Sequence, residues 1–284
     1  MTKATSNWER SWPAPAKINL FLHVVGRRPD GYHLLQTVFQ FLDYCDDLQF
    51  EPRGDNAIVL ATPLPDVPPE KDLTVRAAKA LQAAAKQPTG GATISLSKKL
   101  PLGGGLGGGS SDAATTLIAL NRLWNIGLSR SELCQIGLQL GADVPVFVHG
   151  HACFAEGVGE KFSEVILPPT CYLVTVPPVQ VPTAEIFGAS ELCRETPLIN
   201  ASKWQTGQGH NDLEPVAVAR YPIIGEHLRW LKRYGDARMS GSGACCYVGF
   251  PDKEQAMDAY RNLPVEMSGF VAEGLNRHPL AIAD

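Results

Sequence analysis

The sequence predicts an α+β fold in two domains, with a glycine-rich loop at the centre of the first. Strand-like and helix-like segments are mixed along all 284 residues, a length that suits one large or two medium domains. Two glycine triplets stand between a strand pattern and a helix pattern in residues 98–114. A proline-containing break near residues 164–170 divides the chain into residues 1–166 and 167–284.

Composition and charge exclude several classes of protein. Hydrophobic residues make up 44% of the chain, and the formal net charge of -4 leaves no basic excess to follow a nucleic-acid backbone. No segment has the uninterrupted apolar length of a membrane helix or of a signal peptide at the N-terminus. Seven scattered cysteines form no CxxC pair and have no histidine cluster near them, so neither a zinc site nor a disulfide framework is supported. We expect a cytoplasmic globular protein without nucleic-acid or membrane partners.

The first strand pattern covers residues 16–26, an apolar run that contains Lys17 and Asn19 on one face near its start. A lysine in this setting is usually a solvated edge residue. The strand pattern alone therefore gives a functional role for Lys17 only modest support.

A turn follows, because Pro29-Asp30-Gly31 favours reversal of the chain. It presents Tyr32 and His33 just before the next strand pattern, at residues 34–50. An aromatic residue and a histidine at a turn suit ligand contact and simple packing equally well.

Short elements lead to the glycine-rich loop. Residues 57–61 form an apolar run, several prolines make residues 62–71 irregular, and Asp72 can cap a helix that ends near Lys86. Residues 93–98 alternate like a strand.

The glycine-rich loop predicts a phosphate site. Glycine tolerates positive φ, so successive backbone N–H groups can turn inward and surround an anion. The serines after the loop are expected to cap a helix from about Ser111 to Leu123, whose positive end points at the same place. A flexible linker is the alternative, but the flanking strand and helix patterns disfavour it.

Asp143 follows the next helix. Ser129 and Glu132 form a capping box for that helix, and Gly141 ends it. Asp143 then precedes Pro145, so it can cap a short helix, project into a site from a rigid turn, or do both.

The second domain alternates strands and helices. We expect strands at residues 172–176, before and after the Ser-Gly-Ser-Gly segment 240–243, and near residue 270. Helices are expected from Thr183 onward and over residues 223–234 and 253–263. The 240–243 segment is a plain turn or a second place where bare backbone approaches a ligand.

Three segments resemble the motifs of the GHMP small-molecule kinases. PLGGGLGGGSSDAA looks like the second motif, while PAPAKINLFLHV and MSGSGACCYV are similar to the first and third, in the family's order. The segment 15–46, with GADVPVF and VPTAEIF, is similar to one branch of that family. The likeness runs from about Pro13 to beyond Phe250.

The resemblance implies a two-domain fold. It has an N-terminal ribosomal-protein-S5-domain-2-like domain, a C-terminal ferredoxin-like α/β sandwich and an active site in the cleft between them. It further implies transfer of the ATP γ-phosphate to the 2-hydroxyl of a methylerythritol unit, on a substrate with a cytidine diphosphate moiety, in the non-mevalonate route to isoprenoid precursors. ATP is then the co-substrate, Mg²⁺ is expected with it, and the enzyme is expected as a monomer or weak homodimer.

The same likeness implies roles for the reacting groups. Asp143 would take or orient the hydroxyl proton, and Lys17 would steady Asp143 and the charge that develops during transfer. The ATP-binding residues would be Pro101, Leu102, Gly103, Gly104, Gly105, Leu106, Gly107, Gly108, Gly109, Ser110 and Ser111. The metal ligands stay unknown.

Substrate contacts follow from the same branch of the family. Asn19 would bind the substrate from the face that carries the lysine. Tyr32 and Phe187 would stack on the cytosine ring, His33 would read its polar edge, and Thr183 would lie nearby.

Other functions are kept as alternatives. Another GHMP kinase would act on a different alcohol and leave the turn at residues 29–33 without a role. A non-catalytic nucleotide sensor would be favoured by loss of Lys17 or Asp143, both of which are present. A dinucleotide-dependent oxidoreductase is suggested by the GxGxxG pattern, but this sequence lacks the acidic residue that such folds carry about twenty positions further on. A P-loop is disfavoured because Ser110 stands where that motif needs lysine.

Overall fold

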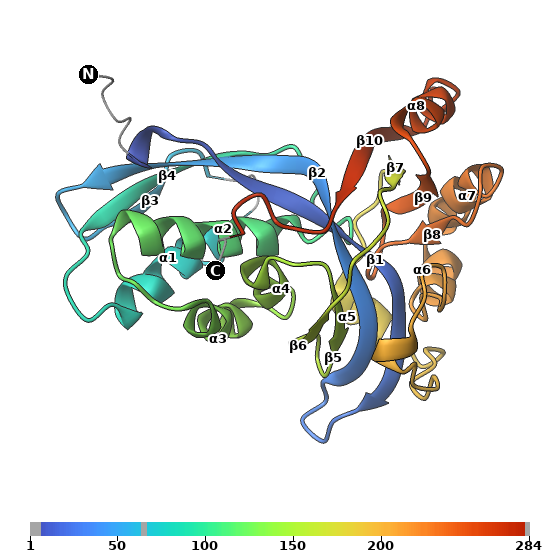
Figure 1. The fold of residues 1–284 in the computed structure, drawn as a ribbon, viewed down its shortest axis with the longest axis horizontal. Helices are drawn as coiled ribbons and strands as arrows, with labels where there is room; N and C mark the ends of the chain where they lie inside the picture. Colours follow the sequence, from blue (N-terminus) through green and yellow to red (C-terminus); the bar gives the residue numbers. More distant parts are fainter. Residues whose placement is uncertain (1–6, 64–66, 282–284) are drawn as a thin grey trace.

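A pair of long antiparallel strands is the framework of the computed structural model, which describes residues 7–63 and 67–281 (Figure 1). β1 (Trp12–Arg27) and β2 (His33–Arg53) are the strands predicted on either side of the turn, and both are longer than predicted. In Figure 1 they run from the helices on the left to those on the right. The two strands therefore connect both halves of the molecule.

The left half is a sheet covered by helices on one face (Figure 1). β4 (Gly91–Ser97) pairs antiparallel with β2 and parallel with β3 (Ile58–Leu60). The covering helices are α1 (Leu73–Ala84), α2 (Gly108–Leu123), α3 (Arg130–Leu140) and α4 (Val144–His149). Phe41 of β2 and Phe147 of α4 are fully buried in the core between the two layers.

The right half has its own strands and core, as the α+β prediction requires. Its strands follow the order β10 (Ser268–Leu275), β7 (Cys171–Val176), β9 (Cys246–Phe250) and β8 (Arg238–Met239). Its helices are α5 (Thr183–Phe187), α6 (Glu214–Arg220), α7 (Pro222–Leu231) and α8 (Lys253–Arg261). The last two residues of β10, Gly274 and Leu275, also pair with β2, so one sheet runs through both halves.

Several local elements differ from the predictions. The β5 (Cys153–Glu156) and β6 (Lys161–Glu164) hairpin was not predicted, and α6 lies where a polar loop was expected. Two short 3-10 helices, η1 (Asn7–Glu9) and η2 (Ala201–Lys203), complete the described elements. Part of the proline-rich segment, residues 64–66, lies outside the described residues. The division at residues 166/167 falls in a stretch without helix or strand and stays a prediction.

Candidate active site

A cavity of about 770 Å³ is lined by residues from both halves of the molecule. Sixteen of the predicted site residues line it: Lys17, Asn19, Tyr32, His33, Pro101, Leu102, Gly103, Gly104, Gly105, Gly107, Gly108, Gly109, Ser110, Asp143, Thr183 and Phe187. The other two, Leu106 and Ser111, are buried in the protein instead. Segments far apart in the sequence thus form one wall.

Lys17 and Asp143 form an ion pair at this wall. Lys17 Nζ lies 3.2 Å from Asp143 Oδ2, and the lysine side chain is 3% exposed while the aspartate side chain is 39% exposed. The lysine is therefore not a solvated edge residue. Asp143 occupies the N-cap position of α4, but its side chain makes no capping hydrogen bond. Its carboxylate is available to Lys17 and to a ligand in the cavity.

The Lys17 ammonium group has further fixed partners. It donates to Asn19 Oδ1 at 2.7 Å and to the Gly105 carbonyl at 3.1 Å, and it lies over the Phe39 ring. Asn19 Nδ2 in turn donates to Thr37 Oγ1 at 2.9 Å. Because both ends of this buried amide are engaged, Asn19 orients the lysine in this structure.

The glycine-rich loop needs glycine for its shape. Gly103, Gly105 and Gly107 have φ angles of 67°, 75° and 72°. A Cβ at Gly105 would lie 2.1 Å from the Ser240 carbonyl oxygen, so the close approach of the 240–243 loop excludes any side chain there. Residues with left-handed backbone allow successive N–H groups to form a concave anion site.

Helix α2 starts at Gly108, three residues before the predicted start, and its N-cap is Gly107. The predicted serine cap is wrong because left-handed Gly107 already turns the chain into the helix, where no side chain caps it. Gly108, Gly109 and Ser110 line the cavity with the first turn of the helix. Their N–H groups stay available to an anion, as at other uncapped helix N-termini.

A second part of the wall is aromatic. The His33 and Phe187 rings are 5.1 Å apart between centroids, and Tyr32 is 62% exposed. Arg194 Nε donates to His33 Nε2 at 3.2 Å. Burial, followed by the charges of Arg194 and Arg27, lowers the pKa of His33. A neutral His33 that accepts at Nε2 carries its proton on Nδ1, as a donor.

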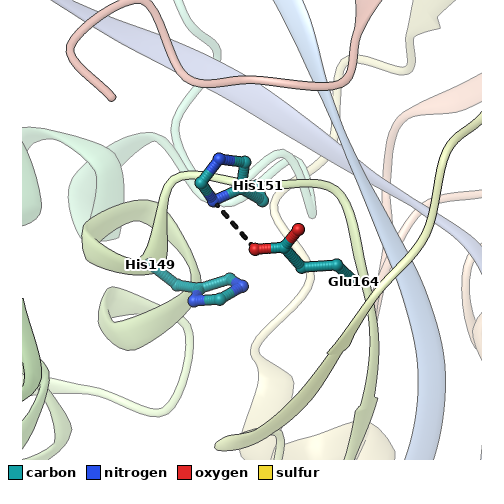
Figure 2. Close-up of side chains that lie close together, drawn as sticks. All are labelled: His149, His151 and Glu164. Carbon is teal, nitrogen blue, oxygen red and sulfur yellow. Dashed lines mark ion pairs between the residues drawn. The ribbon is translucent and has the colours of Figure 1, made fainter. Parts of the chain in front are cut away.

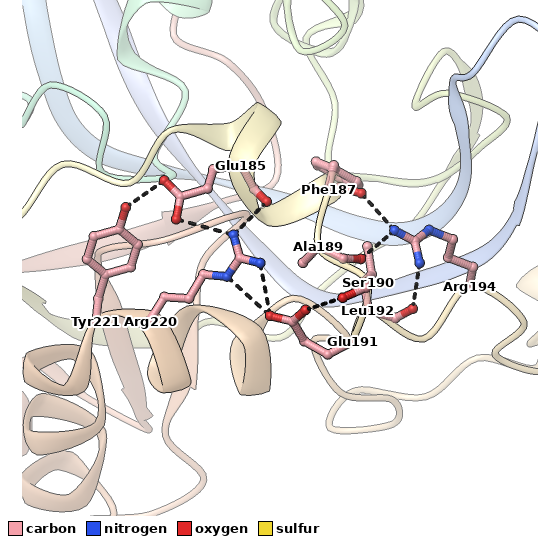
Figure 3. A network of polar contacts seen from close by, with 9 residues as sticks. All are labelled: Glu185, Phe187, Ala189, Ser190, Glu191, Leu192, Arg194, Arg220 and Tyr221. Atoms are coloured by element: carbon pink, nitrogen blue, oxygen red, sulfur yellow. Dashed lines mark hydrogen bonds and ion pairs between the residues drawn. The ribbon is translucent and has the colours of Figure 1, made fainter.

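Helix α5, which carries Phe187, is held from two sides (Figure 3). On one side an Nη atom of Arg194 donates to the Phe187 carbonyl at 3.2 Å. On the other, Arg220 donates to the Glu185 carbonyl at 3.1 Å and the Tyr221 hydroxyl donates to the Glu185 carboxylate at 2.9 Å. These contacts add to the packing of Ile186 in the core of the right half and fix the position of this five-residue helix.

Two family comparisons match both halves of the chain. Residues 72–151 match the family described as GHMP kinases N terminal domain, and residues 190–268 match the one described as GHMP kinases C terminal. The chain belongs to the GHMP kinase family. The sequence-based assignment of the family is thereby confirmed.

The relatives of this GHMP kinase have a common name. The 4-diphosphocytidyl-2-C-methyl-D-erythritol kinase of Dechloromonas aromatica (strain RCB) is 60% identical over 273 residues, which cover 95% of this chain and 98% of the relative. The same enzyme of Thiobacillus denitrificans (strain ATCC 25259 / T1) is 56% identical over 271 residues, covering 95% and 97%.

Solved structures confirm the GHMP kinase fold. The crystal structure of 4-(cytidine 5'-diphospho)-2C-methyl-D-erythritol kinase has a TM-score of 0.78 at 33% identity, covering 93% of this chain and 99% of that one. A mevalonate kinase has a TM-score of 0.71 at 16% identity, covering 95% and 100%, and shares the fold.

Sequence reasoning missed one charged group beside the glycine-rich loop of this GHMP kinase. Lys98 Nζ contacts the buried carboxylates of Asp46 and Asp112, the latter at 2.8 Å. Burial raises the pKa of Asp112 to about 7, although the Lys98 charge opposes the shift. Asp46 also accepts from the Leu100 N–H, so the group ties β2, the loop and α2 together. No local pattern in the sequence joins these residues, because Asp46 is 52 residues from Lys98.

His23 and the cysteine pair, which had no predicted role, lie behind the cavity wall. His23 Nε2 accepts from the His210 N–H at 3.3 Å. Cys245 is fully buried, its N–H donates to the Gly104 carbonyl at 3.0 Å, and burial raises the pKa of its thiol to about 12. Cys245 therefore supports the glycine-rich loop from behind as a small apolar residue.

Proposed function

We propose that this GHMP kinase transfers the γ-phosphate of ATP to the 2-hydroxyl of 4-diphosphocytidyl-2-C-methyl-D-erythritol, in the non-mevalonate route to isoprenoid precursors. One observation carries the proposal: the Lys17–Asp143 ion pair lies in a cavity shared by the glycine-rich loop and the turn with Tyr32 and His33. The names of the relatives at 60% and 56% identity support the same substrate.

The reaction forms a bond from the substrate hydroxyl oxygen to the γ-phosphorus and breaks the bond from that phosphorus to ADP. The Asp143 carboxylate receives or orients the hydroxyl proton. Lys17 stabilises the charge between the nucleophile and the phosphate, and the N–H groups of the glycine-rich loop bind the phosphates. Positioning and electrostatics of this kind account for most of enzymatic phosphoryl transfer.

The cytosine end of the substrate binds at the aromatic wall. Tyr32 and Phe187 stack on the ring, and the Nδ1–H of His33 donates to its polar edge. Thr183, whose hydroxyl lies 2.8 Å from that of Ser242, contacts the substrate between the two ends. Because neighbouring groups already occupy the Asn19 amide, we assign Asn19 first to positioning Lys17 and only second to direct contact with the substrate.

Magnesium enters with ATP, as part of the nucleotide substrate, held mainly by phosphate oxygens. The Ser110 hydroxyl stands at the cavity, whereas the Ser111 hydroxyl is buried without a hydrogen-bond partner in the described part of the chain. Ser110 is thus the better placed of the two, and we assign no further protein ligand.

The oligomeric state and the cellular compartment of the enzyme are part of the proposal. We propose a monomer or weak homodimer from the family resemblance. All seven cysteines are free thiols, which supports a reducing cytoplasm. None of the helices within residues 7–63 and 67–281 is long and apolar enough to cross a membrane.

The test is an ADP-release assay with ATP, magnesium and 4-diphosphocytidyl-2-C-methyl-D-erythritol. Galactose, homoserine and mevalonate serve as control alcohols. We expect turnover with the cytidylyl substrate and background release with the other three. Turnover with one of the controls, and none with the cytidylyl substrate, would assign the enzyme to another branch of the family.

A further inference from the structure

Three side chains outside the active-site cavity converge at the C-terminal end of α4 (Figure 2). His149 is the last residue of that helix, Gly150 ends it in the left-handed conformation, and His151 follows at once. Glu164 reaches the same place from the last position of β6. The ligand atoms of these three side chains all lie within 4.8 Å of one another.

Each of the two imidazole rings has a buried nitrogen that makes no hydrogen bond among the described residues. These atoms are His149 Nε2 and His151 Nδ1, although His151 Nδ1 has an ion-pair contact with Glu164. A buried polar atom without a partner is unfavourable, and native proteins leave few of them. The unpartnered His149 Nε2, close to a His151 Nδ1 that has an ion-pair contact but no hydrogen bond, therefore indicates a missing ligand at the cluster.

The spacing of the cluster fits a tetrahedral cation. His151 Nδ1 lies 3.4 Å from Glu164 Oε1. Two ligands at about 2.1 Å from a tetrahedral zinc ion are separated by roughly 3.4 Å, so this pair already has the required spacing. The third ligand atom, on His149, lies at most 4.8 Å from the other two, so it must approach them by up to about 1.4 Å to reach the same spacing.

The backbone around the cluster is fixed. The His149 ring stacks on Phe162 of β6, with 4.8 Å between centroids, and its carbonyl accepts from Arg130 Nη1 at 2.9 Å. The Gly150 carbonyl accepts from the His278 N–H at 2.9 Å. The rings are therefore held near each other before any ion arrives, which lowers the entropic cost of binding.

We propose that His149, His151 and Glu164 form a binding site for a divalent transition-metal cation of the Zn²⁺ class, with water as the fourth ligand. Two imidazoles and one carboxylate suit zinc, whereas Mg²⁺ prefers oxygen ligands. The site lies about 9 Å from Asp143 along α4, estimated from the helical rise, and takes no part in phosphoryl transfer. Its effect is to clamp the end of α4 to the β5–β6 hairpin.

The test uses the full chain, freed of metal and without nucleotide. Calorimetric titration with Zn²⁺ is expected to give one site per chain, and titration with Mg²⁺ no heat at that site. Co²⁺ as a spectroscopic probe is expected to give the visible bands of a tetrahedral site without a thiolate charge-transfer band. Zinc is also expected to raise the melting temperature, because the ion binds the folded chain.

Variants assign the ligands. Glu164→Gln and His151→Gln are each expected to weaken zinc binding at least about tenfold, since even outer partners of metal ligands contribute 10- to 100-fold. The Glu164 side chain is 64% exposed, so its variant is expected to fold normally. Glu273→Gln, a half-exposed glutamate on another strand, and His210→Gln, an exposed histidine, are the matched controls.

Cysteine is the alternative zinc ligand in this chain, and Cys193 is its one exposed thiol. Cys193→Ser is expected to bind zinc like the unmodified chain. Wild-type affinity in both Glu164→Gln and His151→Gln, or a thiolate band in the Co²⁺ spectrum, would overturn the proposal.

Discussion

The Lys17 ammonium group shows how the active site depends on single side chains. A buried charge is tolerated only when neighbouring groups compensate it, and Lys17 has the Asp143 carboxylate, the Asn19 amide oxygen and one loop carbonyl. Only the carboxylate carries charge. Replacing Asp143 by asparagine therefore removes the charge of the reacting pair and keeps the volume of the side chain.

Asp143→Asn is expected to lower kcat by roughly 10²-fold or more and to leave the fold intact. The amide cannot accept the hydroxyl proton, while the side chain is 39% exposed and makes no capping bond that folding requires. Steady-state ADP release at saturating substrates measures kcat, and circular dichroism checks the fold.

Asp47→Asn is the matched control for that variant. Asp47 is 38% exposed and lies 3.2 Å from Lys99, so its exposure and its lysine contact resemble those of Asp143 outside the cavity. We expect kcat within about twofold of the unmodified enzyme. Near-normal turnover in Asp143→Asn would remove Asp143 from the mechanism.

Phe187→Ala and Tyr32→Ala are expected to raise KM for the cytidylyl substrate by roughly tenfold, with a smaller effect on KM for ATP. Stacking of a base on an aromatic ring contributes about 1–3 kcal/mol. Tyr260→Ala, which removes a partly exposed tyrosine from α8, is the control. Equal effects on both KM values would move the cytosine site elsewhere.

Arg194→Gln tests whether the state of His33 controls substrate binding. Arg194 bonds to His33 Nε2, and its charge is one cause that lowers the pKa of His33. Without the guanidinium, that pKa is expected to rise toward its usual value, so more of His33 is protonated near pH 6.

The expected result is a KM for the cytidylyl substrate that rises several-fold at pH 8, because a neutral His33 without the Arg194 donor no longer keeps its proton on Nδ1. The rise is expected to be smaller at pH 6, where both nitrogens of a protonated ring donate, with little change in kcat. Steady-state kinetics between pH 6 and 8 measure both quantities. A pH profile of KM identical to that of the unmodified enzyme would show that Arg194 does not act on substrate binding through His33.

At the scale of one element, the glycine-rich loop combines backbone strain with close contact. Gly105→Ala introduces a Cβ 2.1 Å from the Ser240 carbonyl at a φ of 75°, so the loop must move away from the 240–243 segment. We expect kcat/KM for ATP to fall by at least about 10²-fold, on the scale reported for misplaced catalytic groups. Kinetics with ATP as the varied substrate measure this loss.

Gly127→Ala provides the matched control for the loop. Gly127 has nearly the same φ, 76°, but a Cβ there would meet nothing within 4 Å. Its alanine variant carries the left-handed strain, about 1–2 kcal/mol, without the clash. Stability is expected to fall in both variants and ATP kinetics only in Gly105→Ala. Equal kinetic losses would assign the effect to strain rather than to loop position.

The elements that sequence reasoning predicted best have strong local signals. The capping box at Ser129 and Glu132 and the Asp72 cap appear as predicted, because a side chain and a backbone group a few residues apart determine each. The N-cap of α2 was missed, since glycine and serine both suit an N-cap, and the left-handed backbone of Gly107 and its close packing against Phe147 appear only in the folded structure. The Lys98 group was missed because Asp46 is 52 residues away.

For the whole molecule, the C-terminal segment connects the two halves. β10 pairs first with β7 and then, through Gly274 and Leu275, with β2. The chain then returns to the core of the left half, where Leu280 is buried. The domain boundary at residues 166/167 therefore stays a proposal, because the left half of the molecule also contains residues that follow residue 167 in the chain.

His278, in that segment, makes the stability of the whole protein sensitive to acid. Its ring is 2% exposed, contacts Phe41 and Phe147 edge-on, and accepts from the Leu280 N–H at 3.0 Å. Burial lowers its pKa from 6.5 to about 3. Between these values the unfolded chain binds a proton that the native protein excludes, so stability is lost as pH falls from 6.5 toward 3.

His278→Asn is expected to remove this dependence, because the amide oxygen can still accept from Leu280 but does not titrate. The unfolding free energy from urea titrations at pH 6, 5.5 and 5 should fall less steeply in the variant, by up to about 1.4 kcal/mol per pH unit. Asp112, with its pKa raised to about 7, contributes the opposite slope in both proteins and cancels in the difference. Parallel pH curves for the two proteins would show that burial of His278 does not exclude its proton from the native state.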